Sequence, residues 1–211
     1  MKLQMTASMF FAGLVFAPVS AFAVTLGLQT GAPTLSAGAA VIDYIEFAPD
    51  GDLSTVAAEV DDTSGVSPDG FTTIDFGVGF SLADPTDSAD PAFAGFLDVI
   101  DDAGQFLAGD LLAIGFTEDV IELQFDNLSG TGAGAFGTSV LVLVTFDDPL
   151  GANPFGDLFD GDALGASISI ARVQPVTPIP LPAALPLLGA GLGVLVILRL
   201  RRTASSRFLS A

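Results

Sequence analysis

Residues 71–80 read FTTIDFGVGF, and large apolar side chains occupy every second position from Ile74 to Phe80. Because successive side chains of a β-strand point to opposite faces of a sheet, this alternation predicts a strand with one buried face. The face expected to be buried carries Thr72, Ile74, Phe76, Val78 and Phe80. The opposite face carries Phe71, Thr73, Asp75, Gly77 and Gly79. Such a strand needs paired neighbours and a partner surface for its apolar face.

Similar β-rich runs, separated by Gly, Asp, Pro and Ser, lie on both sides of this strand. Residues 141–146, LVLVTF, are apolar on both faces and predict a central strand. The expected strands are residues 24–29, 39–49, 54–60, 70–82, 95–101, 110–117, 119–128, 138–148 and 163–173. This spacing predicts an all-β domain over residues 24–173, an antiparallel sandwich with a jelly-roll-like arrangement. A helix within residues 89–100 is the one local alternative.

Charge is distributed unevenly along the chain. The 25 acids face only 6 Lys and Arg, a formal net charge of −19, and every acid lies between Asp43 and Asp162. Arg172 is the single base of residues 24–173, which gives this section a formal charge of −24. Such a surface repels phosphate backbones, so the sequence excludes nucleic acid as a partner. It suits a cation-rich exterior or the binding of divalent cations.

Several kinds of chemistry are excluded by missing residue types. The chain has no Cys and no His, which removes thiol nucleophiles, histidine bases and the usual zinc ligands. With no Trp and one Tyr, an aromatic platform for sugars would have to use mainly Phe. The 18 Phe residues are interpreted chiefly as core filling. We therefore expect no enzyme activity and no catalytic residues.

The first 23 residues have the pattern of an export signal. Lys2 precedes an apolar stretch, Pro18 breaks that stretch, and Ala21-Phe22-Ala23 follows. Small residues at the first and third positions of such a triplet fit the pockets of signal peptidase. The pattern predicts cleavage after Ala23, with Val24 as the mature N-terminus.

The C-terminal region combines a proline-rich stretch, an apolar run and arginines. Residues 174–182, QPVTPIPLP, predict an extended spacer, because proline lacks a backbone donor. Residues 183–198 are apolar and predict a transmembrane helix. Arg199, Arg201 and Arg202 begin a basic tail, 199–211, that the positive-inside rule leaves in the cytoplasm.

This order of features resembles a bacterial sorting signal. Ile179, Pro180, Leu181, Pro182 and Ala183, followed by an apolar helix and an arginine cluster, resemble the PEP-CTERM class, and more narrowly its VPLPA-CTERM variant. The resemblance covers about the last 30 residues, with Ile179 in place of Val. It implies export across the inner membrane, a single-pass intermediate, and processing near the motif by an exosortase. It also implies release or attachment at the cell surface, in bacteria that often make exopolysaccharide.

Acid-rich turns are the only other candidate sites. Asp157, Asp160 and Asp162, in FGDLFDGDALG, come nearest to a calcium loop, which needs six to eight converging oxygen ligands. Asp and Gly also form turns without any ligand, so these acids have a purely structural explanation. A carboxylate pair for glycoside hydrolysis cannot be selected among 25 acids.

Together these features predict an exported surface or matrix protein with a structural or adhesive role and no cofactor. Its expected partners are signal peptidase, an exosortase-like enzyme, the inner membrane and exopolysaccharide. The alternative is a calcium-dependent carbohydrate-binding module that a single transmembrane helix anchors permanently.

Overall fold

The fold is described from a computed structural model, which covers residues 24–151 and 153–175. These residues form nine strands and two helical turns. The strands are β1 (Thr30–Phe47), β2 (Asp50–Glu59), β3 (Asp62–Ser64), β4 (Thr73–Ser81), β5 (Ala94–Asp101), β6 (Gly104–Phe116), β7 (Val120–Ser129), β8 (Val140–Phe146) and β9 (Ala163–Val173). The helical turns are α1 (Ala133–Phe136) and α2 (Pro154–Asp157). The all-β prediction is confirmed, and residues 89–100 contain turns and β5 instead of a helix.

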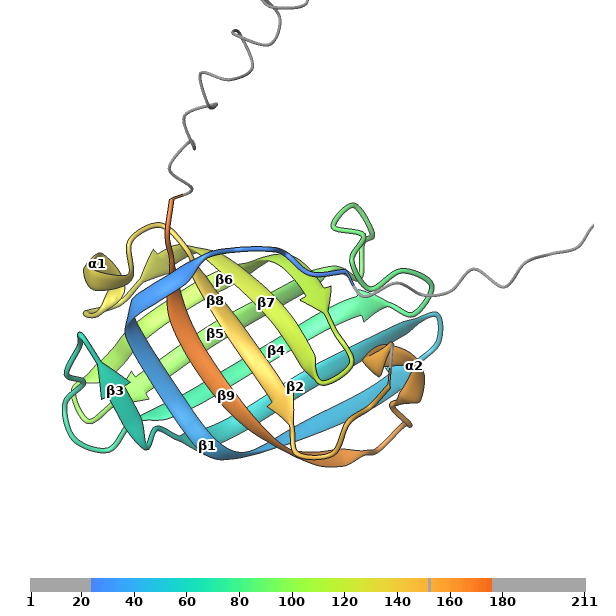
Figure 1. The fold of residues 1–211 in the computed structure, drawn as a ribbon, viewed down its shortest axis with the longest axis horizontal. Coiled ribbons are helices and arrows are strands. Elements are labelled where there is room, and N and C mark those ends of the chain that lie inside the picture. Colours follow the sequence, from blue (N-terminus) through green and yellow to red (C-terminus); the bar gives the residue numbers. More distant parts are fainter. Residues whose placement is uncertain (1–23, 152, 176–211) are drawn as a thin grey trace, which may run out of the picture. The chain divides into compact units, whose positions relative to one another are not determined.

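All nine strands belong to one antiparallel sheet with the order β2-β4-β5-β6-β7-β8-β9-β1-β3. An additional pairing between β1 and β2 closes the sheet on itself (Figure 1). The sequence predicted two stacked sheets, whereas the structure has one closed sheet. Alternation tells which side chains point inward, and it is the same in both arrangements. The closing pairing is a long-range contact that periodicity does not contain.

β1 is the element that makes closure possible. It pairs with β9 along one edge, and with β3 and then β2 along the other. Its register shifts between Gly31 and Thr34 and again between Ala37 and Ala40. Pro33 lies within the first shift, where the missing backbone donor is tolerated. Residues 30–38 were not expected to be a strand, because Gly and Pro interrupt the apolar pattern.

The core fills the inside of the closed sheet. Ile74, Phe76, Val78 and Phe80 are buried as the alternation predicted, and so are the inward side chains of β7 and β8. The ring of Phe155, from α2, packs edge-on against Phe80, with ring centroids 4.6 Å apart. α1 and α2 lie at opposite ends of the sheet (Figure 1). Phe136 of α1 and Phe155 of α2 are both buried and contribute to the two ends of the core.

Residues 24–29 form an arm across the outside of the sheet (Figure 1, blue). Val24 pairs with Phe116 at the end of β6, and the Leu26 amide donates to a Glu122 carboxylate oxygen at 2.6 Å. The expected strand over these residues is reduced to that single bridge. On β8, Leu141 points outward between inward neighbours yet is only 3% exposed. A covered outer face explains why LVLVTF is apolar on both sides.

Several predicted features lie outside the described residues. They are Ala21 and Ala23 of the signal, the motif Ile179 to Ala183, the helix over 183–198, and Arg199, Arg201 and Arg202. Within residues 24–151 and 153–175, no helix is long and apolar enough to cross a membrane. The compact unit that contains the sheet ends at Gln174, one residue after β9.

Candidate functional site

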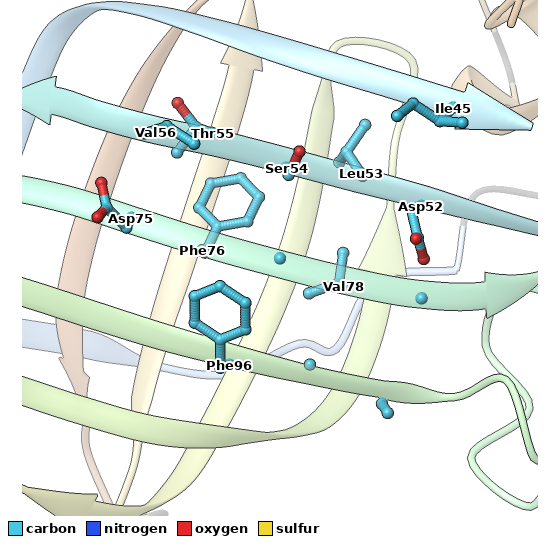
Figure 2. Close-up of a pocket in the computed structure, with 14 residues that line it drawn as sticks. Ile45, Asp52, Leu53, Ser54, Thr55, Val56, Asp75, Phe76, Val78 and Phe96 are labelled. Atoms are coloured by element: carbon cyan, nitrogen blue, oxygen red, sulfur yellow. The ribbon is translucent and has the colours of Figure 1, made fainter.

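Two outward-facing glycines create an open groove on the outside of the sheet. Gly77 and Gly79 of β4 point away from the core because they alternate with the buried Phe76 and Val78. With no side chains there, the surface between β2 and β5 is hollowed into a groove of about 620 Å³ (Figure 2). We call this the outer groove. Its walls and rim include Ile45, Asp52, Ser54, Val56, Asp75, Ala94 and Phe96.

Phe96 of β5 is the exposed aromatic residue of the outer groove, whereas Phe76 is buried. It pairs directly with Gly77, and a Cβ added to Gly77 would lie 2.9 Å from Cε1 of the Phe96 ring. Figure 2 shows the ring face-on, lying along the sheet and directed from β5 toward β4. The ring occupies the space that a side chain at position 77 would take, as aromatic residues do opposite strand glycines. Phe96 remains 53% exposed, so much of its apolar surface is accessible to a ligand.

Two carboxylates border the outer groove on the β2 and β4 side. Asp52 pairs with Gly79, and its Oδ1 lies 2.9 Å from the position of a Cβ at that glycine. Partial burial, and then the charge of Asp50, raise the pKa of Asp52. The Asp75 carboxylate accepts a hydrogen bond from the Ala57 amide, in the bulge of β2. The outer groove thus combines an apolar surface with hydrogen-bond acceptors.

A second, smaller hollow adjoins the outer groove on the other side of Phe96. It measures about 290 Å³ and crosses β5, β6 and β7. Its polar groups form two amide–carboxylate pairs. Gln105 Nε2 donates to Asp98 Oδ1 at 3.2 Å, and Asn127 Nδ2 donates to Asp110 Oδ2 at 3.2 Å. We call this the polar hollow.

One acid side chain, that of Asp160, joins the loop predicted as a calcium site to β1. Asp160 accepts from the Glu46 amide at 3.0 Å, and Asp162 accepts from the Phe159 amide at 2.9 Å. Asp157 is exposed at the end of α2. Burial, and then the charges of Glu46 and Asp160, raise the pKa of Tyr44 beneath this loop. Within the described ranges, no three acids gather closely enough to hold a metal ion.

The acids of DPTDSADP form a series of turns. Side-chain oxygens of Asp84, Asp87 and Asp90 each accept from the amide two residues later, at 2.8–3.0 Å. Their backbone carbonyls each accept from the amide three residues later, at 3.0–3.2 Å. The segment is therefore three consecutive Asx-type turns with a three-residue period. These carboxylates stabilise a loop, in agreement with the structural explanation for acid-rich turns.

Neither the outer groove nor the polar hollow was identified from the sequence. The available signal was the pair Gly77 and Gly79 on the outward face of a predicted strand, because a strand glycine indicates close approach of another group. The identity of that group required the β4–β5 register. Comparisons with protein-family models, curated proteins and solved structures found no match.

Proposed function

We propose that this chain is an exported, non-enzymatic protein of the bacterial cell surface or extracellular matrix, with an adhesive role for its β domain. The observation that carries the proposal is the order of segments along the chain. A signal-type N-terminus precedes an acidic β domain, and a proline-rich motif, an apolar run and an arginine cluster follow it. This order matches delivery by signal peptidase and sorting by an exosortase-like enzyme at the inner membrane.

The described residues offer two kinds of support. The acids of the turns accept backbone hydrogen bonds at Asp84, Asp87, Asp90, Asp160 and Asp162, which is a stabilising use of carboxylates. The recessed surface of the outer groove is open and lies on the outside of a rigid sheet, where a large partner has access. The open groove suits the binding of a large partner better than an enclosed small-molecule site would.

Val24, the first residue after the predicted cleavage site, is hydrogen-bonded to the sheet. The carbonyl of Val24 accepts a hydrogen bond from the Phe116 amide at 2.6 Å. Cleavage after Ala23 would leave the first mature residue bound to the sheet. Protein sequencing of the exported product is therefore expected to start at Val24.

Mass spectrometry of the C-terminal peptide, from protein purified from its native cells, tests the sorting proposal. We expect a C-terminus near Pro182 or Ala183, with Arg199, Arg201 and Arg202 removed. The control for motif-directed processing is a variant with alanine at Pro180, Leu181 and Pro182. This variant should keep its C-terminal tail. Protein from native cells that still ends at Ala211 would contradict the proposal and indicate a permanent anchor.

A further inference from the structure

We propose that the outer groove and the polar hollow together bind an uncharged polysaccharide, with Phe96 as the stacking platform. This names a ligand class for the adhesive role proposed above, on which it rests. The inference depends on four observations: the accessible ring, the adjacency of the two hollows, the presence of hydrogen-bond donors and the sign of the surrounding charge.

The ring provides a flat apolar surface. Phe96 is directed from β5 over Gly77 of β4, and the residue is 53% exposed (Figure 2). A sugar ring presents C–H groups on its faces and hydroxyl groups around its edge. Stacking places those C–H groups on the aromatic face and leaves the hydroxyls to polar groups beside it. Phe96 has polar groups on both sides.

The two hollows adjoin at Phe96, which lines both. Ser54, Gly77, Phe96 and Asp110 are paired in sequence across four neighbouring strands. At about 4.8 Å per strand, this row extends about 14 Å across the outside of the sheet. The site is therefore elongated and open, which suits a polymer of sugar rings better than a single compact ligand.

Hydrogen-bond donors distinguish a saccharide from a cationic peptide. A guanidinium or ammonium group only donates, so it needs carboxylates alone. The polar hollow instead contains two amides, Gln105 and Asn127, each beside a carboxylate. Hydroxyl groups both donate and accept hydrogen bonds. An amide–carboxylate pair offers them a donor, the amide N–H, and an acceptor, the carboxylate oxygen. This favours a hydroxyl-rich ligand.

The sign of the charge excludes acidic polysaccharides. Asp52, Asp75, Asp98 and Asp110 line the two hollows. The single arginine of the described residues, Arg172, lies in β9 near Gly137 and lines neither hollow. A chain of uronate or sulfated sugars would be repelled by this field. An uncharged chain meets no such penalty.

The test is isothermal titration of the full chain, produced in an exporting bacterial host and purified in detergent. The probes are cellohexaose, mannohexaose and xylohexaose, with hexagalacturonate and an arginine-rich peptide as the charged alternatives. We expect binding of at least one neutral hexasaccharide and none of hexagalacturonate. Phe96→Ala should weaken that binding by about tenfold or more, since it removes the aromatic anchor.

Phe159→Ala is the matched control, because Phe159 is also an exposed phenylalanine but lines neither hollow. It should leave affinity unchanged. Gln105→Leu, which removes a donor from the polar hollow, should weaken binding without removing the ring.

Three results would overturn the inference: no binding of any neutral hexasaccharide, equal affinity of wild type and Phe96→Ala, or preferred binding of the arginine-rich peptide. Each would leave the sorting proposal intact if the native C-terminus is processed. An unprocessed tail would contradict sorting without changing the titration.

Discussion

At the scale of single residues, the outer groove depends on two outward positions of β4 that carry no side chain. Gly77 and Gly79 both face outward, and two different neighbours occupy the space above them. Phe96 covers Gly77 with a side chain, whereas Gly79 is approached by the Ala92 carbonyl as well as by Asp52. A side chain can rotate away from an added methyl group, but a backbone carbonyl cannot without distorting the β4–β5 connection. The two glycines should therefore respond differently to the same substitution.

Gly77→Ala and Gly79→Ala form a matched pair that tests this difference. At position 79 the new Cβ would lie 2.8 Å from the Ala92 carbonyl oxygen, and we expect a loss of about 1–3 kcal/mol in unfolding free energy. At position 77 the ring can move, and the lower chain entropy of alanine offsets the contact, so the change should stay within about 1 kcal/mol. Urea denaturation measures both. Equal losses would show that the Phe96 ring is rigidly fixed.

Asp52 gives a prediction about pH. Its pKa is raised by partial burial and then by Asp50, so between its ordinary and raised values the folded protein retains a proton that the unfolded chain has lost. The free energy of unfolding therefore falls as pH rises through that window. Asp52→Asn should melt at a higher temperature than wild type at pH 7, with the difference vanishing below the ordinary carboxyl pKa.

Asp98→Asn is the control for Asp52→Asn, because it removes the same formal charge from the outer face. At pH 7, Asp98→Asn should raise the melting temperature less than Asp52→Asn does. If Asp52→Asn stabilised the protein equally in acid, the raised pKa of Asp52 would not be the cause.

At the scale of elements, the arm over residues 24–29 is held by few contacts. The Leu26 amide depends on one oxygen of Glu122, and Val24 forms a single bridge with Phe116. Sequence and structure also differ at the arm, because side-chain character predicted a strand over residues 24–29 where the structure has a single bridge.

Glu122→Ala tests how the arm is held. We expect faster amide hydrogen exchange in residues 24–29 and a loss of about 1 kcal/mol in unfolding free energy, the usual contribution of one hydrogen bond. Glu122→Gln keeps an acceptor oxygen and should be milder. Glu118→Ala removes an exposed acid nearby and should leave the exchange of the arm unchanged. An arm that exchanges at the wild-type rate in Glu122→Ala would show that other contacts fix it.

At the scale of the whole molecule, the main electrostatic feature is the excess of acidic residues. A formal charge of −24 on residues 24–173 concentrates on a closed sheet when the chain folds, and self-repulsion then opposes the compact state. Raising NaCl from about 0.01 M to about 1 M shortens the Debye length from about 30 Å to about 3 Å. Salt should therefore stabilise this protein more than it stabilises a neutral domain of similar size.

Thermal melting in NaCl, MgCl2 and CaCl2 at equal ionic strength measures this effect. We expect NaCl to raise the melting temperature by several degrees, and MgCl2 and CaCl2 to raise it equally. A larger shift with calcium, abolished by Asp160→Asn or Asp162→Asn, would instead establish a calcium loop.

The sequence predicted the strands better than their arrangement. Alternation in residues 71–80 identified the buried face of β4 correctly, because that signal is local. It missed residues 30–38 of β1, where register shifts around Pro33 and Ala37 break the period. It also missed the groove, because the pairing of Gly77 with Phe96 joins residues from different strands. Long-range register is absent from local patterns, so closure and groove required the structure.

The junction between the arm and β9 has a mechanical consequence. The Gln174 amide donates to the Gln29 carbonyl at 2.8 Å, and Thr30 pairs with Val173, so the start of β1 and the end of β9 lie side by side in an antiparallel pair. A force that pulled these two ends apart would break the β1–β9 hydrogen bonds one after another. A force between the outer groove and a tether at Gln174 would instead cross the closed sheet, where many hydrogen bonds share the load. We therefore expect the domain to resist a force applied at the outer groove better than a force between the start of β1 and the end of β9.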